Sequence, residues 1–224
     1  MEAQLRSEEL IEQLASGLRP VRRMAPPAWQ AGLWLALAVT AIGLAVLIFG
    51  LRHDLGARLR LPQEVVQWLA SVGTGICAAL AAAMLARADR SPAWGLLPLP
   101  PLALWLASLG WGCLADVARL GPIEGQLGTS WGCLRFILLL GAPLAAALLL
   151  LLRHAGPVRP RPVLLLGALA SAALCSAGLT LFHHLDAAVM VLLWHGGAAL
   201  LLLALTAGLG DRLLLRPSAA RRPG

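Results

Sequence analysis

Two cysteines in this chain end the same tripeptide. Trp-Gly-Cys occurs twice, ending at Cys113 and at Cys133, and the two copies stand on either side of one connection between apolar runs. In an oxidising compartment, two such thiols can form a disulfide or respond reversibly to oxidants, provided that their Cα atoms come within about 7 Å. Alternatively, Trp111 and Trp131 anchor helix ends at a membrane interface and the cysteines fill space. The pattern therefore predicts either a redox pair or two interfacial anchors.

Three histidines are expected near the same membrane face. His183 and His184 end one apolar run, and His195 lies about two turns into the next. Imidazole and thiolate groups suit zinc, copper or another soft metal, so these histidines and the two cysteines are candidate sensing residues, with the metal unknown. For His195 the simpler expectation is a hydrogen bond between helices, because an ionisable side chain inside a span usually has a partner there. No cofactor is expected, since no second histidine at a matching depth completes a haem site.

The elements that position these residues are six uncharged, mostly apolar runs between Arg23 and Asp211. A helix rises about 1.5 Å per residue, so roughly 20 apolar residues cross a hydrocarbon core of about 30 Å. With 59% hydrophobic and 13% charged residues, the chain has too few polar side chains for a soluble globule. A membrane barrel would need alternating strands, and these runs are continuously apolar. The sequence predicts an all-α integral membrane protein, a six-helix bundle with spans near residues 29–49, 64–86, 94–113, 133–152, 162–182 and 187–210.

Residues 1–28 differ from the membrane domain at 29–210 and from the short Arg-rich tail at 211–224. Ser7 can cap a helix, and this helix has apolar residues at helical spacing: Leu10, Ile11, Leu14 and Leu18. So short a helix is marginal alone, and its apolar stripe needs a partner groove or a membrane surface. Its polar face is acidic, whereas lipid-surface helices are usually basic, which favours a protein partner. The acidic start also argues against a cleaved signal peptide.

Arginine placement predicts the orientation. All 18 basic residues are arginine; thirteen flank one side of the predicted bundle and five the other. Short Arg-rich loops stay in the cytoplasm, so both termini are expected there, in a bacterial inner membrane, with loops 52–63, 114–132 and 183–186 in the periplasm. Arg52, Arg58 and Arg60 weaken the first of these assignments, and Asp54 and Glu64 partly offset them. The net charge of +7 reflects this orientation, and no nucleic-acid partner is expected, because no soluble segment is long enough to build a basic face.

Other function classes fit the chain less well. No paired-carboxylate, nucleophile–base or H-E-x-x-H arrangement occurs, so we expect no enzyme. The main alternative is a small transporter or channel-like protein. Its path would need polar residues inside the spans, which are almost bare apart from His195, although Pro98, Pro100 and Pro101 could break the third span as transporter helices are broken.

Several segments together resemble the NrsF family. They are residues 9–15, 18–23, Pro26 with Pro27, 94–101, 109–114, Cys133, 153–162 and 191–195, and in this order they cover nearly the whole chain. The resemblance implies a six-helix inner-membrane anti-sigma factor that holds an extracytoplasmic-function sigma factor inactive. It also implies that the cytoplasmic segment binds the sigma factor and that the periplasmic rim senses stress through cysteine.

The rim departs from the family pattern. Cys133 matches one family cysteine, but the second, expected near the end of the fifth span before an acidic residue, is replaced by His183 or His184 ahead of Asp186. Three explanations are open: Cys113 is the substitute partner, the sensor binds metal through Cys133 and histidine, or this member has lost the sensing mode. In the first two cases, oxidation or metal occupation would shift the helices and release the sigma factor.

Overall fold

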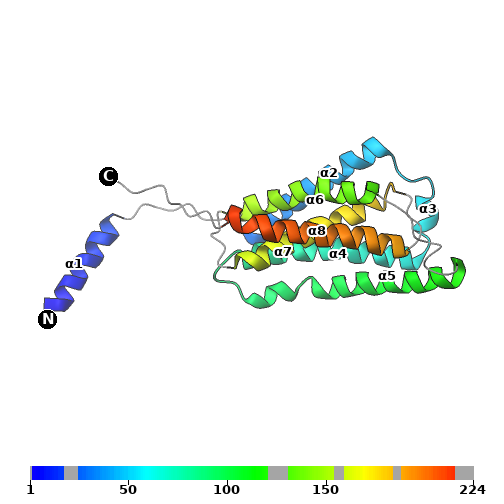
Figure 1. Ribbon diagram of the computed structural model, residues 1–224. Helices are drawn as coiled ribbons and strands as arrows, with labels where there is room; N and C mark the ends of the chain where they lie inside the picture. Colours follow the sequence, from blue (N-terminus) through cyan, green and yellow to red (C-terminus); the bar gives the residue numbers. More distant parts are fainter. Residues whose placement is uncertain (1, 18–24, 121–130, 154–158, 184–187, 215–224) are drawn as a thin grey trace.

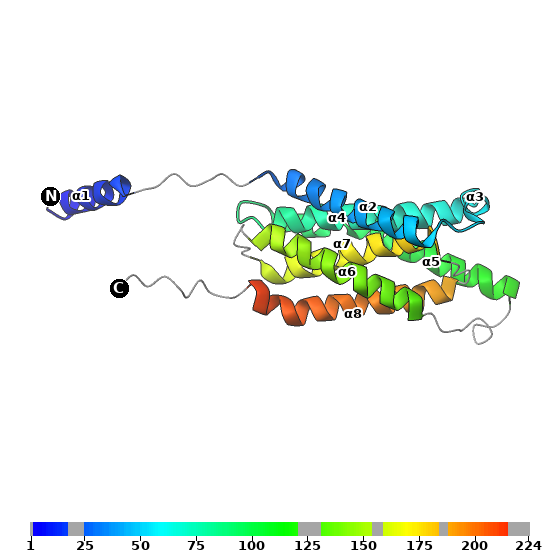
Figure 2. The same cartoon turned by 90° about the horizontal axis from the view of Figure 1, so that it is seen from above.

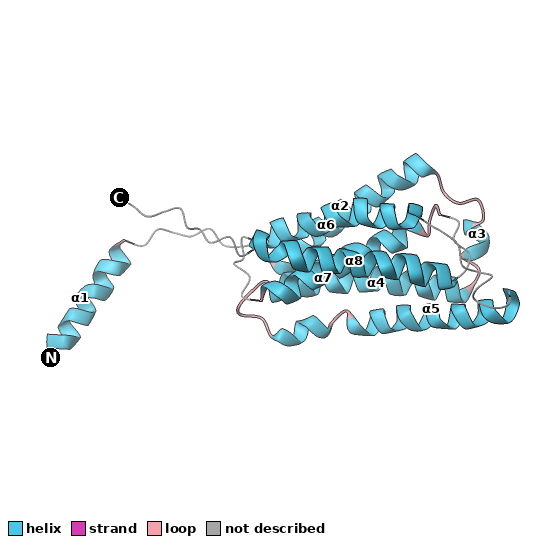
Figure 3. Ribbon diagram, viewed as in Figure 1, coloured by secondary structure: helices cyan, strands magenta, loops and turns pink. Residues whose placement is uncertain are grey.

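The computed structural model describes residues 2–17, 25–120, 131–153, 159–183 and 188–214. Within these ranges all regular structure is helical, as Figure 3 shows. The elements are α1 (Glu2–Ser16), α2 (Pro27–Phe49), α3 (Leu55–Arg58), α4 (Pro62–Leu85), η1 (Pro92–Leu96), α5 (Leu99–Leu120), α6 (Trp131–Leu152), α7 (Pro160–Leu179) and α8 (Ala188–Leu214). The predicted all-helical fold is confirmed for these parts of the chain.

In the described part of the chain, six helical segments are long and apolar enough to cross a membrane, and each overlaps one of the six predicted runs. They lie side by side in one bundle, where the start of α2 and the end of α8 are at one end and α3 is at the other (Figure 1). We call the latter the α3 end. Because successive spans alternate in direction and their number is even, the first span begins and the last span ends at the same end of the bundle.

The third predicted run differs from its helix at both ends. Ser91 Oγ accepts a hydrogen bond from the N–H of Ala93 and starts a short 3-10 turn, and α5 begins only at Leu99. Pro100 and Pro101 fall in the first turn of α5, where proline is tolerated because its missing N–H has no helical partner. At its other end α5 continues to Leu120, so residues 114–120, expected in a loop, are helical. Alanine and arginine in this stretch are good helix formers, and a helix does not end where its hydrophobic residues do.

Helix α7 is the most enclosed of the six and packs against α2, α4, α6 and α8. Figure 2 shows it in the middle of the bundle, between α4 and α6. Small residues allow this close packing: a Cβ on Gly75 of α4 would lie 2.6 Å from Cγ of Leu174. Side chains of α4 also bond the main chain of α7, from Ser71 Oγ to the carbonyl of Ala173 (2.9 Å) and from Trp68 Nε1 to that of Ala177 (3.1 Å). Small residues and buried polar contacts are the usual means of helix association where lipid replaces water.

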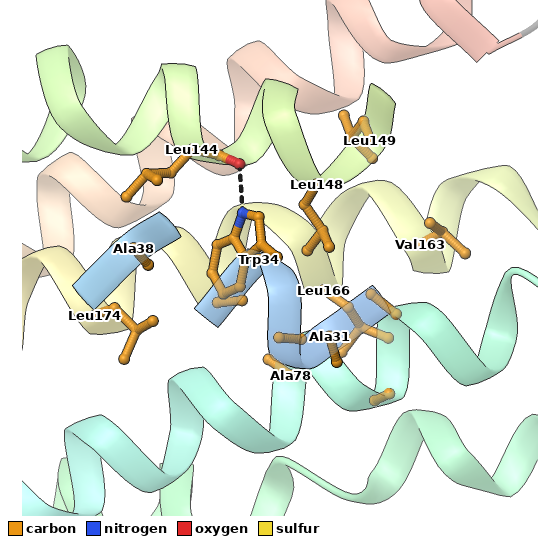
Figure 4. Packing of buried hydrophobic residues seen from close by; sticks show 14 of the residues in the cluster. Ala31, Trp34, Ala38, Ala78, Leu144, Leu148, Leu149, Val163, Leu166 and Leu174 are labelled. Carbon is orange, nitrogen blue, oxygen red and sulfur yellow. Dashed lines mark hydrogen bonds between the residues drawn. The ribbon is translucent and has the colours of Figure 1, made fainter. Parts of the chain in front are cut away.

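Trp34 joins the outer helix α2 to the rest of the bundle. Its side chain is 1% exposed and packs among Ala38, Ala78 and Leu148 (Figure 4). The indole N–H donates a 2.8 Å hydrogen bond to the carbonyl of Leu144 on α6. The bond satisfies the one polar atom of a large apolar side chain, so the whole indole can be buried.

Helix α1 starts earlier than the sequence indicated. It begins at Glu2, so Ser7 is an interior residue of the helix and the prediction that Ser7 caps it was wrong. Residues 3–6 include alanine, glutamine, leucine and arginine, which all favour helix, and so they extend it by more than a turn. The helix ends at Ser16, directly before Gly17, a residue that disfavours helix continuation.

Candidate functional site

Cys133 and His183 meet at the α3 end. Cys133, in the first turn of α6, is fully buried, and its Sγ lies 3.7 Å from Nε2 of His183. His183 follows α7 in a tight turn, where its N–H donates to the carbonyl of Leu179 at 2.9 Å. This turn folds the imidazole back over the start of α6. A thiol and an imidazole in contact are a pair of ligands for a soft metal.

Aromatic packing fixes the turn that carries His183. Phe182 stacks on Phe49 of α2, with ring centroids 5.2 Å apart, and meets Phe136 of α6 edge to face at 5.0 Å. Rings from two helices, α2 and α6, therefore hold Phe182, the residue before His183, in place. Such offset and edge-to-face pairs are favoured arrangements of aromatic side chains.

Arg52 lies in the connection between α2 and α4 and bonds the turn that carries His183. Its side chain is buried, its main-chain N–H donates to the carbonyl of Leu181 at 3.0 Å, and one terminal nitrogen donates to the carbonyl of His183 at 3.1 Å. The other edge of the guanidinium donates hydrogen bonds to both carboxylate oxygens of Asp54, at 2.6 and 2.8 Å. Bidentate contacts of this kind are strong and directional. The hydrogen bond from Arg52 holds the pKa of Asp54 well below its usual range.

A second arginine completes this ion network. Arg58 donates to Glu64 at 2.8 Å and lies 3.5 Å from Asp54. Asp54 and Glu64, which were expected to offset the arginines of this connection in part, form ion pairs with Arg52 and Arg58. Arg60, by contrast, is exposed.

No disulfide joins the two predicted redox cysteines, Cys113 and Cys133, in the described part of the chain. Cys113 is half-buried on α5, which packs against α4 and α8, whereas Cys133 is on α6, which packs against α2, α7 and α8. Their pairing on oxidation stays a prediction. Among the described residues, no group of three or more His, Cys, Asp or Glu side chains is placed to hold a metal ion. Of the predicted histidines, His184 lies outside the described residues.

His195 makes the interhelical hydrogen bond that the sequence predicted. It is 4% exposed on α8, and its Nδ1 lies 2.5 Å from Oγ of Ser176 on α7. The serine could not have been selected from the sequence, because many small polar residues occur in these spans and only helix register determines which one faces the imidazole.

The predicted partner-binding face is solvent-exposed. On α1, Leu10, Ile11 and Leu14 are 55%, 64% and 65% exposed, while Leu18 lies outside the described residues. Large apolar side chains gathered on one exposed helix face are a feature of interaction surfaces. The three described residues of the predicted face are therefore available to a partner.

Comparison with known proteins identifies the family. The model of the family NrsF, described as negative regulator of sigma F, matches residues 14–216. The chain belongs to the NrsF family. A relative named probable anti-sigma-F factor NrsF, from Azospira oryzae, is 33% identical in an alignment of 190 residues that covers 76% of this chain and 83% of the relative. No solved structure matches. As an NrsF protein, the chain is a negative regulator of a sigma factor, a regulatory rather than an enzymatic kind of protein.

The segment that the family model matches contains some of the candidate residues and not others. Cys113, Cys133, His183 and His195 fall within it, whereas Leu10 and Ile11 of α1 precede its first residue, Leu14. The structure adds Arg52 and Asp54, which sequence reasoning considered only as charges. Their spacing, two residues apart at the end of an apolar run, was a signal for a local ion pair. Nothing in the spacing indicated the bond from Arg52 to the carbonyl of His183.

Proposed function

We propose that this NrsF protein is a membrane-embedded anti-sigma factor that holds an extracytoplasmic-function sigma factor through α1 and releases it when Cys133 is oxidised or when the Cys133–His183 pair binds metal. The observation that carries the binding part is the exposed apolar face of α1. An apolar helix face of this size binds most favourably in a groove of a partner protein. A sigma factor bound there is kept at the membrane, away from RNA polymerase.

A reporter of sigma-dependent transcription in the host tests the binding face. Leu14→Asp places a charge in the centre of the face and is expected to abolish repression. At about 100° per residue, Ser16 lies roughly 160° around the helix from Leu14, so Ser16→Asp adds the same charge on the other side and serves as the matched control. The face is excluded if Leu14→Asp represses normally, or if both variants lose repression equally.

The six apolar helices support insertion in the bacterial inner membrane, with the α3 end in the periplasm and α1 in the cytoplasm. The ion pairs at Arg52 and Arg58 neutralise much of the positive charge that would oppose this orientation. Single cysteines placed at exposed positions test it: His53→Cys at the α3 end and Asp89→Cys at the other. A membrane-impermeant maleimide applied to cells with a permeable outer membrane is expected to label only the first above the background of the parent protein.

The sensing part rests on the geometry of the thiol–imidazole pair. Tetrahedral zinc with Zn–S of about 2.3 Å and Zn–N of about 2.0–2.1 Å separates sulfur and nitrogen by about 3.5–3.6 Å. The observed 3.7 Å between Cys133 Sγ and His183 Nε2 is close to that separation. The pair can therefore supply two ligands to a soft metal with little movement, and water or further side chains complete the coordination.

A contiguous set of contacts joins this pair to the end of α2. The turn that carries His183 bonds Arg52, directly after α2, and Phe182 in the same turn stacks on Phe49 at the end of α2. The chain that precedes α2 leads to α1. A metal or an oxidant that moves His183 would therefore act on α2 first, provided that the bundle has two arrangements that the signal can select between.

A further inference from the structure

A cavity of about 860 Å³ lies between α4, α5, α7 and α8 at the α3 end. Its wall includes two indoles, Trp68 and Trp105, the hydroxyls of Ser71 and Ser176, and His195. Small-molecule sites usually have volumes of about 300–1,000 Å³ and combine apolar and aromatic walls with a few polar groups. By size and lining, this cavity is therefore suited to an organic molecule.

His195 provides a polar atom that no described residue satisfies. Nδ1 is bonded to Ser176, while Nε2 is buried and has no hydrogen-bond partner among the described residues. A buried nitrogen without a partner costs free energy, and a ligand in the cavity can recover it. The Ser176 hydroxyl can donate to Nδ1, which leaves Nε2 as a donor, or accept from it, which leaves Nε2 as an acceptor.

Most charged residues of the cavity wall are engaged within the protein, and Arg119, which also lines the cavity, is exposed on α5. Arg52 and Arg58 are paired with Asp54 and Glu64, and Asp116 accepts the N–H of Ala188 at the start of α8 at 2.7 Å. These charges are therefore engaged within the protein. His195 lies about two turns inside an apolar helix, so a molecule that reaches it must enter surroundings that exclude ions.

We propose that this cavity binds a small lipid-soluble quinone or quinol whose ring oxygen hydrogen-bonds Nε2 of His195 and whose ring packs against Trp105. A quinone oxygen accepts from a protonated Nε2, and a quinol hydroxyl donates to an unprotonated one. The two forms differ little in size, and rotation of the Ser176 hydroxyl lets the site bind either. The inference concerns binding alone, rests on the cavity and His195, and is independent of the anti-sigma proposal.

The test is equilibrium dialysis of the full-length protein in detergent, with empty micelles as blank. Duroquinone, a fully methylated benzoquinone that has no free ring position for thiols to attack, and its reduced form are the probes. Durene, the same methylated ring without oxygens, is the matched control ligand. We expect both oxygenated forms to bind at least about threefold more tightly than durene, since one hydrogen bond contributes about 3- to 10-fold in affinity. Equal binding of durene, or no saturable binding of either oxygenated form, would overturn the proposal.

Two substitutions test whether Nε2 of His195 contacts the ligand. His195→Asn keeps a polar group near the Nδ1 position for Ser176 and removes the atom at Nε2, so duroquinone affinity is expected to fall about 3- to 10-fold. His195→Gln restores an amide near the Nε2 position and is expected to stay within about twofold of the parent. Unchanged affinity in His195→Asn refutes the assignment. The comparison of duroquinone with durene needs no variant, so it remains decisive even where a substitution impairs folding. Failure of binding with repression intact would leave the anti-sigma proposal standing.

Discussion

Replacing His183 by Gln removes the imidazole from Cys133 and leaves the main chain unchanged. The carbonyl of His183, which Arg52 bonds at 3.1 Å, stays in place, so the ion network at the α3 end should persist. Glutamine is close to histidine in length, and it is a poor ligand for soft metals. The substitution therefore separates metal binding from the structural role of the turn.

The size of the expected effect follows from the ligand count. A four-ligand zinc site provides about 10–16 kcal/mol of apparent binding free energy, or about 2.5–4 kcal/mol per ligand. At about 1.4 kcal/mol per tenfold, the loss of one ligand weakens binding roughly 100- to 1,000-fold. Cys133→Ser should weaken it by a similar factor, because a hydroxyl does not replace a thiolate for a soft ion.

The assay is titration of the purified full-length protein with Cd(II), followed through the ultraviolet thiolate-to-metal charge-transfer band. His53→Gln is the matched control, since His53 is exposed at the same end of the bundle. It should bind like the parent protein. Parent-like affinity in His183→Gln would refute the metal-pair reasoning, and an equal loss in His53→Gln would show that the effect is not specific to the pair.

The remaining predictions concern pH and packing. Because the hydrogen bond from Arg52 depresses the pKa of Asp54, the stability from this pair is fully present above the unfolded value of about 3.9 and is lost only as the pH falls below it. The melting temperature in detergent should therefore show no Asp54-dependent change between pH 5 and 7 and a fall below about pH 4 that Asp54→Asn removes; an Asp54-dependent change near neutral pH would contradict the pairing. Gly75→Ala would put Cβ 2.6 Å from Leu174, so we expect a loss of about 1–3 kcal/mol, measured against Gly110→Ala, whose Cβ meets nothing within 4 Å. Similar melting temperatures for the two glycine variants would show that α4 and α7 can separate without cost.

The hydrophobic runs predicted most of the fold because length and apolarity suffice to define a spanning helix. Their ends were less predictable: α5 continues to Leu120 through a charged stretch, and α1 starts at Glu2 rather than after Ser7. In both places intrinsic helix propensity extends the helix past the boundary that charge or a capping residue indicated. Helix ends depend on small local contributions to helix stability, and the periodicity of hydrophobic residues does not reveal these.

The candidate site was predictable in part. Residue chemistry selected Cys133, His183 and His195, and the expectation of an interhelical bond for His195 was confirmed. The pairing of Cys133 with His183 depends on the turn after α7, and the partnership with Ser176 depends on helix register. Contacts between residues 50 and 19 positions apart in the chain are set by packing, which a single sequence does not encode in any local pattern.

The central claim is that α1 holds a sigma factor, and its most direct test is retention by the full-length protein. The parent chain and Leu14→Asp are extracted from host membranes in mild detergent, immobilised, and washed, and retained proteins are quantified by mass spectrometry. Burial of one leucine contributes about 1.5–3 kcal/mol, so the account predicts that the parent retains an extracytoplasmic-function sigma factor and that Leu14→Asp retains at least tenfold less. Absence of any sigma factor from the parent sample, or equal retention by both, would contradict it.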